Sequence, residues 1–369
     1  MKLGYTLWND YHFTNYPEIL ANLREIGVEI IVIVPQYLLD RDDRARLVGV
    51  YLPIKNLVNE VKQSGFELMI KPHFIPRESN GKQPPNWQGW VGTVDMNSWG
   101  LLMGRIKLEL ESLTRDYRPR YFCIGSDLVG THAQREEWAK IIDAMTGFEV
   151  SLVYASNFSQ PLIKRFRWAL FWSSLLGRHN RTLDLAFQSE RFEIPDVQRA
   201  QVARSVYRSG FRFPLDAVGL NLYWPPEDKK YEDLSEKWFQ YERSGFEINY
   251  VESVEMWRGT NPLWITECDL IGQHRSDLDY YQKWWETCLD VWGNMCEVLI
   301  CKEDETPQWI ETARQSALIK SKIAEWRQKR DQIEDLPPSL TAYRSHRTNR
   351  EQENLDLKQS SFSFREEDN

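Results

Sequence analysis

The chain has 369 residues, which is long for an ordinary domain but within the range of a single α/β barrel. Its 54 acidic residues outnumber 46 Lys and Arg, and this net charge of -8 argues against a nucleic-acid partner, which usually meets a basic face. No stretch approaches the roughly 20 consecutive apolar residues of a membrane span, and the N-terminus lacks the apolar core of a signal peptide. We therefore expect no membrane partner and a cytoplasmic location.

Short apolar segments rich in β-forming residues recur along the chain and alternate with helix-like segments. The strand-like segments are LGYTLW from Leu3, EIIVIVPQY from Glu29, ELMIKPHF from Glu67, YFCIGSDL from Tyr121, VSLVYASNF from Val150, AVGLNLYW from Ala217, PLWITECDL from Pro262 and EVLICKEDE from Glu297. Eight such units, with continuous rather than alternating apolar strands, predict an α/β fold of the (β/α)8 TIM-barrel type. A doubly wound open sheet is the alternative, and it is disfavoured because no glycine-rich phosphate fingerprint follows the first strand.

The helix-like segments between these strands include YPEILANLREIG, PIKNLVNEVKQSG, WGLLMGRIKLELESLTRDY, REEWAKIIDAMTG and LDYYQKWWETCLDVW, and several end at Gly. Residues 159–213, between the fifth and sixth strands, are expected to form a helical insertion. Residues 330–369 are polar and without apolar period, so we expect a disordered tail after a barrel of residues 1–329.

Polar and aromatic residues at the C-terminal ends of the predicted strands are candidates for a functional site, because barrel enzymes place their chemistry there. The candidates are Trp8, Tyr37, Lys71, His73, Asp127, Asn157, Asn221, Tyr223, Trp224 and Glu267. Trp87 and Trp90, on the loop after the third strand, either cover the rim or form a stacking platform for a sugar ring.

The five cysteines have no CxxC spacing and the six histidines have no HxH or HExxH spacing. We therefore expect reduced thiols and no metal site.

Asp127 and Glu267 end the fourth and seventh predicted strands, which face each other across a barrel mouth. Two carboxyl groups flanking a scissile bond are the arrangement that glycoside hydrolysis needs, with one as acid/base and the other as nucleophile. Such chemistry needs no cofactor. Asp127 as a helix N-cap and Glu267 as an ion-paired residue of the mouth are the structural alternatives.

The segments IVIVPQY, LMIKPHF, FCIGSDL, VYASNF, DAVGLNLYWP and PLWITECD, in this order, resemble glycoside hydrolase family 113, which are barrel β-mannanases. The resemblance covers most of residues 1–325 apart from the insertion. It implies a retaining hydrolase of β-linked mannose-type oligosaccharides, with Glu267 as nucleophile and Asp127 as acid/base. It also implies that Lys71, His73, Asn221 and Tyr223 line the sugar site.

The chain departs from the family at Asp127, where the family has Glu. The missing methylene withdraws the carboxyl by about 1.5 Å. Retaining pairs lie about 5 to 5.5 Å apart and inverting pairs about 6.5 to 9.5 Å, so the shorter arm leaves three outcomes open. The chain is an active hydrolase, a hydrolase of altered mechanism, or a barrel that binds carbohydrate without cleaving it.

Overall fold

The computed structural model describes residues 1–8, 10–40, 47–49, 54–77, 96–126, 128, 135–156, 215–224, 239–243, 246–270, 277–302 and 308–334. The chain divides into two compact units, Met1–Ile323 and Ala324–Asn369. The first unit contains all the described strands. In the second, the described residues are those of the C-terminal part of one helix, α13 (Ala317–Glu334).

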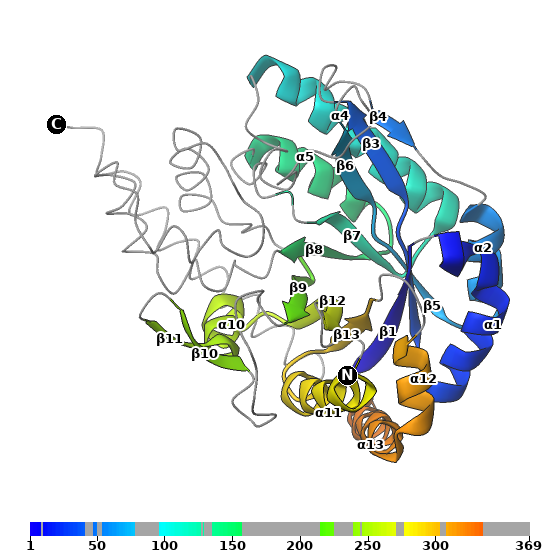
Figure 1. The fold of residues 1–369 in the computed structure, drawn as a ribbon. Coiled ribbons are helices and arrows are strands. Elements are labelled where there is room, and N and C mark those ends of the chain that lie inside the picture. The colour runs from blue at the N-terminus through cyan, green and yellow to red at the C-terminus, as the bar shows by residue number, and fades with distance from the viewer. Residues whose placement is uncertain are drawn as a thin grey trace. The chain divides into compact units, whose positions relative to one another are not determined.

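Eight parallel strands close into a barrel and follow one another around it in chain order (Figure 1). They are β1 (Lys2–Leu7), β2 (Ile30–Ile33), β5 (Glu67–Ile70), β7 (Tyr121–Ser126), β8 (Ser151–Ser156), β9 (Ala217–Trp224), β12 (Leu263–Leu270) and β13 (Val298–Cys301). The barrel closes where β1 pairs with β13, with Lys2 opposite Val298. The other edge of β1 pairs with β2. Each strand corresponds to one of the eight segments found in the sequence, so the predicted (β/α)8 fold is confirmed.

Helices lie outside the ring of strands (Figure 1). Besides α13 they are α1 (Asp10–Ile26), α2 (Ile54–Gln63), α4 (Met96–Tyr117), α5 (Arg135–Thr146), α10 (Tyr250–Arg258), α11 (Leu278–Gly293) and α12 (Gln308–Gln315). Helix α11 begins at an N-cap, Asp277, whose side chain accepts a hydrogen bond from the backbone N–H of Tyr280 at 3.1 Å. Among the helices described here, none is long and apolar enough to cross a membrane.

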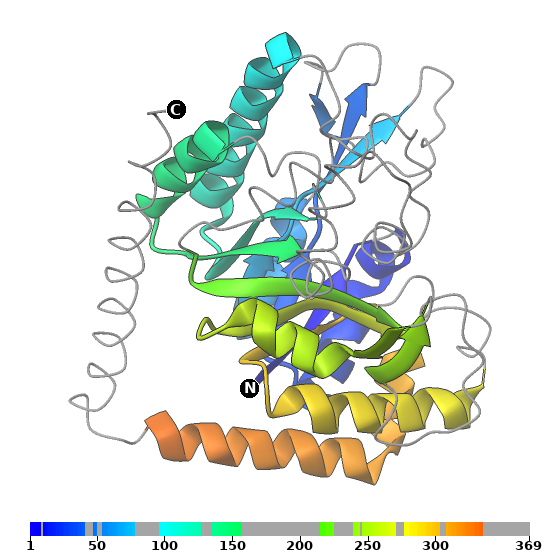
Figure 2. The ribbon, with the colours of Figure 1, turned by 90° about the vertical axis from the view of Figure 1, so that its left-hand side faces the viewer.

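A small second sheet follows the C-terminal ends of two barrel strands (Figure 2). It consists of β3 (Gln36–Asp40), β4 (Leu47–Gly49) and β6 (His73–Arg77), with β3 parallel to β6 and antiparallel to β4. EIIVIVPQY and ELMIKPHF, each predicted as a single strand, are each divided into two, which corrects that prediction. Pro35 and Pro72 have no N–H to donate, so each ends the barrel ladder and the chain starts a new strand beyond it.

A hairpin of β10 (Gln240–Arg243) and β11 (Phe246–Asn249) precedes α10. The sequence analysis did not predict it. Residues 159–213, the predicted insertion, and residues 335–369 of the predicted tail lie outside the described residues. Helix α13 continues to Glu334, so residues 330–334 are helical, although the tail was predicted to begin at 330.

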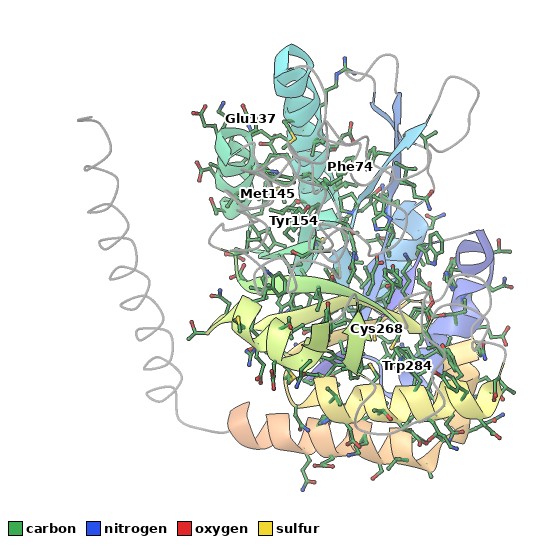
Figure 3. The ribbon with its side chains drawn as sticks, turned by 60° about the vertical axis from the view of Figure 1, so that its left-hand side comes forward. Phe74, Glu137, Met145, Tyr154, Cys268 and Trp284 are labelled. Atoms are coloured by element: carbon green, nitrogen blue, oxygen red, sulfur yellow. The ribbon has the colours of Figure 1, made fainter. Side chains whose placement is uncertain are left out.

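The interior of the barrel is filled by side chains from several strands, as is usual for this fold. The buried cluster contains Ile30, Val32, Val34, Met69, Tyr121, Cys123, Val153, Ala155, Ala217, Trp264, Val298 and Ile300, and Trp8 packs against it. Cys268 on β12 and Trp284 on α11, both labelled in Figure 3, are fully buried. Trp138, Trp285, Trp292 and Trp309 are fully buried too, so these tryptophans belong to the packing of the helices and not to a sugar platform.

Candidate functional site at the barrel mouth

Glu267 lies in the C-terminal half of β12, and its side chain is almost completely buried at 1 % exposure. The register in which β12 pairs with β9 shifts between Ile265 and Glu267, directly before the carboxylate. The pairing of β7 with β8 shifts in the same way between Cys123 and Ser126, directly before Asp127 in the sequence. Irregular pairing at a barrel rim redirects the side chains that follow it, so the shift on β12 helps to set the direction of Glu267.

One oxygen of Glu267, Oε1, is held from the end of β5. Lys71 Nζ donates to it at 2.6 Å, and Lys71 is itself fully buried. The Nε2 atom of His73, the first residue of β6, lies 3.3 Å from the same oxygen. The 2.6 Å contact between Lys71 Nζ and Oε1 is short even for a charge-assisted hydrogen bond, so the position of Oε1 is well defined.

The other oxygen, Oε2, faces Lys302, which directly follows β13. Lys302 Nζ donates to Oε2 at 3.2 Å and to the hydroxyl of Tyr223 at 2.9 Å. The ammonium group also lies 4.7 Å from the centroid of the Trp8 ring, within cation–π range. Glu267 therefore contacts two lysine ammonium groups, one on each oxygen.

Asn221 joins this ion cluster to the strand that leads to Asp127. Its Oδ1 accepts hydrogen bonds from Lys71 Nζ at 2.9 Å and from Thr266 Oγ1 at 2.9 Å. Its Nδ2 donates to Ser126 Oγ, on the last residue of β7, at 3.1 Å. All of these residues are buried, so a single network links the ends of β5, β7, β9 and β12.

The network decides the charge state of Glu267. Burial alone would raise the pKa of this carboxyl group, but Lys302 and Lys71, together with His73, hold the pKa well below its usual range. Burial lowers the pKa of His73, against the opposing effect of Glu267, so the imidazole is neutral at neutral pH. Glu267 is therefore a carboxylate at neutral pH and is suited to the role of nucleophile or base, not to that of a proton donor.

Trp8 is held at the mouth through its backbone. Its N–H contacts Nδ1 of His12 at 3.4 Å, and its carbonyl accepts a hydrogen bond from Gln36 Nε2 at 3.0 Å. His12 is fully buried, and burial lowers its pKa to about 4, so it stays neutral. The Trp8 ring packs on the barrel core and leaves part of its surface open.

The structure brings together five of the residues that the sequence analysis singled out, namely Lys71, His73, Asn221, Tyr223 and Glu267. Trp8 joins them through Lys302. Tyr37 does not: it stacks on Phe74 with ring centroids 5.4 Å apart, and its hydroxyl contacts Glu109 of α4. Trp224 is the last residue of β9. Asp127, Asn157, Trp87 and Trp90 lie outside the described residues.

Three residues of the network were missed from the sequence: Lys302, Thr266 and Ser126. Lys302 has a recognisable signal, because it directly follows a buried apolar strand, as Lys71 does after β5. It lies in EVLICKEDE, the segment predicted as the eighth strand. Among the residues that the structure describes, no group of three His, Cys, Asp or Glu side chains is arranged to hold a metal ion.

These features define the chain as a (β/α)8-barrel protein with a buried charged site at the C-terminal ends of its strands. No family model matches the chain, and no curated protein matches it. In fold it is similar to a GH113 β-1,4-mannanase, with a TM-score of 0.54 at 10% sequence identity over 88% of this chain and 97% of that one. It is also similar to a GH113 β-mannanase from Alicyclobacillus acidocaldarius, with a TM-score of 0.50 at 12% identity over 89% of this chain and 96% of that one. The likeness shows the fold, a (β/α)8 barrel.

Proposed function

We propose that the protein is a retaining glycoside hydrolase that acts on β-linked mannose-type or related oligosaccharides. The observation that carries the proposal is the buried carboxylate of Glu267, held ionised at the mouth of the barrel by contacts on both of its oxygens. The fold shared with two β-mannanases supports the substrate class.

In the proposed mechanism, an oxygen of Glu267 attacks the anomeric carbon while the glycosidic C–O bond breaks. Asp127 gives its proton to the leaving oxygen, and a covalent glycosyl–enzyme ester forms. Asp127 then accepts a proton from water, which attacks the anomeric carbon and releases Glu267 as a carboxylate. Asn221 of β9 hydrogen-bonds both to Ser126, which directly precedes Asp127 in the sequence, and to Thr266, which directly precedes Glu267.

The first test is hydrolysis of aryl β-glycosides and manno-oligosaccharides by the wild type and by the Glu267→Gln variant. We expect turnover by the wild type and none detectable in the variant. Glu255→Gln, the same change at an exposed site on α10, is the matched control and should keep wild-type activity. Loss of activity in both variants, or in neither, would contradict the assigned role of Glu267.

Because Glu267→Gln removes the counter-charge of two lysines, a second test uses the unaltered protein. A 2-deoxy-2-fluoro β-mannoside with a good leaving group should leave a covalent sugar adduct on the peptide that contains Glu267, detected by mass spectrometry. An adduct on another carboxylate would assign the nucleophile elsewhere. Product anomers followed by NMR should show retention, and inversion would exclude the proposed mechanism.

The second candidate function is a carbohydrate-binding barrel with weak or no catalysis. The two lysine ammonium groups on the Glu267 carboxylate favour this second function. They stabilise the carboxylate and so make it a weaker nucleophile, and their positive charge opposes the positive charge that develops on the sugar during cleavage. Asp127, one methylene shorter than Glu, favours this function as well. Measurable binding of manno-oligosaccharides by calorimetry, without turnover by the wild type, would support this candidate.

A further inference from the structure

Lys302 occupies an unusual place in the site. It directly follows β13, its side chain is 9 % exposed, and its backbone N–H donates to the carbonyl of Cys268 on β12 at 3.1 Å. The lysine is thus fixed at its backbone to the strand that carries Glu267. Its ammonium group reaches back to the carboxylate between two aromatic rings, with Trp8 at 4.7 Å and Tyr223 at 5.5 Å from their centroids.

The two oxygens of Glu267 are held differently. Oε1 has the shorter contact, 2.6 Å, with a lysine that has no exposed surface, and His73 lies against the same oxygen. Oε2 has the longer contact, 3.2 Å, with a lysine that keeps some exposure to solvent. An incoming sugar therefore meets less competition at Oε2 than at Oε1.

We propose that Lys302 is a positioning residue that holds Oε2 of Glu267, the oxygen that attacks the sugar, in a fixed place through its contacts with Tyr223 and Trp8. Lys71 fixes one end of the carboxylate and Lys302 fixes the other, so the group cannot rotate about its last bond. The proposal rests on the proposed role of Glu267 as nucleophile. Holding a reacting atom in place matters because misplacement by 1 Å costs a reaction about 100-fold.

The titration of Glu267 depends on every group that faces it. Lys71 after β5 and His73 on β6 face Oε1, and Lys302 after β13 faces Oε2. Tyr223 of β9 faces Lys302, and the Cys123 thiol of β7, whose pKa is raised to about 11 by burial, interacts more weakly with the cluster. On its own strand, the buried Asp269 lies two residues beyond Glu267. Of these groups, Lys302 is the cation at Oε2.

The experiment compares Lys302→Met, which keeps most of the apolar stem, with Lys302→Arg, which keeps the charge. The titration of Glu267 is followed by carbon-13 NMR of the side-chain carboxyl, with the signal assigned by its absence in Glu267→Gln. We expect the pKa of Glu267 to rise in Lys302→Met and to return toward the wild-type value in Lys302→Arg. Lys283→Met, at an exposed site on α11, should leave the titration unchanged.

Kinetics supply the second readout. Since Glu267 must be ionised to attack, kcat/KM falls as the pH drops through its pKa, so the acid limb of Lys302→Met should lie at higher pH than that of the wild type. At neutral pH we expect kcat to fall by about 100-fold with little change in KM. A merely structural role for Lys302 would lower thermal stability without moving either the titration or the acid limb.

The outcomes separate the two proposals. An unchanged Glu267 titration in Lys302→Met overturns the positioning role, whatever the enzyme's activity. If the pKa of Glu267 rises in Lys302→Met but the wild type hydrolyses no glycoside, the contact between Lys302 and Glu267 stands and the proposed hydrolase activity is overturned. Should Lys302→Met fail to fold, Tyr223→Phe removes the hydroxyl that holds Lys302 and should move the titration in the same direction by less. No movement in that variant would contradict the proposal.

Discussion

At the residue scale, the site is dominated by a lysine with no exposed surface. Lys71 is tolerated inside the barrel because its ammonium group donates to Glu267, to Asn221 and to the carbonyl of Thr266. A buried ion pair need not stabilise a fold, but removing one member leaves the other charge uncompensated. The resemblance implies that Lys71 lines the sugar site, and the structure shows its ammonium group hydrogen-bonded to Glu267.

Lys71→Met tests this coupling through stability. We expect the variant to lose about 3–5 kcal/mol of unfolding free energy, because Glu267 keeps its charge in a dry site with one lysine instead of two. Chemical denaturation followed by circular dichroism measures the loss. Lys107→Met on α4 is the matched control: its ion pair with Glu111 is partly exposed, and its loss should cost less than about 0.5 kcal/mol.

The double variant Lys71→Met with Glu267→Gln separates charge from packing. If the cost of Lys71→Met comes from the uncompensated carboxylate, the loss of unfolding free energy in the double variant should be smaller than the sum of the two single losses. The expected difference is at least about 1 kcal/mol. Additive costs would mean that Lys71 matters for its volume alone.

At the element scale, prediction from sequence succeeded for the strands of the barrel and failed just beyond them. The apolar runs in EIIVIVPQY and ELMIKPHF are strands, but Pro35 and Pro72 divert the chain into β3 and β6, which pair with each other. Residue type alone did not show this, because Gln36, Tyr37 and Phe74 suit a strand in either sheet. The same diversion buries Tyr37 against Phe74 and α4 instead of leaving it at the mouth.

Strand β7 offers a test of how packing positions the mouth. A Cβ atom on Gly125 would lie 2.8 Å from the Tyr154 ring and 2.9 Å from the Trp138 ring, two buried side chains packed edge to face. We expect Gly125→Ala to cost about 1–3 kcal/mol of unfolding free energy, because neither ring has room to move. We also expect activity to fall, since the displaced strand carries Ser126 and leads to Asp127.

The matched control is Gly104→Ala on α4, where the added Cβ meets nothing within 4 Å. Alanine is the better helix former, so this variant should gain about 0.5–1 kcal/mol and keep its activity. Thermal unfolding of both variants measures whether each change lowers or raises the stability. A stable and fully active Gly125→Ala would show that β7 has more freedom than its contacts indicate.

At the scale of the molecule, the alternation of eight apolar segments with helices was enough to predict the closed barrel. The ion cluster was only partly predictable. Glu267, Lys71, His73 and Asn221 are predicted from their places near the C-terminal ends of strands, and the resemblance implies their roles. Their contacts with one another depend on barrel closure, which brings together Lys71 and Glu267, 196 positions apart. Lys302 is not among the sequence candidates, because its contacts with Glu267 and Trp8 appear only in the folded chain.

Barrel closure also creates a second ion cluster, at the N-terminal ends of the strands. Glu67 of β5 accepts from Lys2 of β1 at 2.9 and 2.8 Å and from the Tyr121 hydroxyl of β7 at 2.8 Å, and it pairs with Arg120 at 2.6 Å. Burial opposes ionisation, but these partners lower the pKa of Glu67 below its usual value. The unfolded chain therefore binds a proton at higher pH than the folded one, and the stability that Glu67 contributes is lost as the pH falls through the folded-state pKa.

Glu67→Gln should accordingly lose about 1–2 kcal/mol of unfolding free energy at pH 7, a modest figure because the cluster is partly open to solvent. The difference from the wild type should shrink as the pH falls below the ordinary pKa of a Glu carboxyl and then through the lower folded-state pKa of Glu67, where the wild-type carboxyl also becomes protonated. Urea denaturation from pH 7 to pH 3 measures it, with Glu18→Gln at an exposed site on α1 as the control that stays close to wild type throughout. A cost that stayed constant with pH would mean that the geometry of the cluster, and not the charge of Glu67, joins β1, β5 and β7 at the base of the barrel.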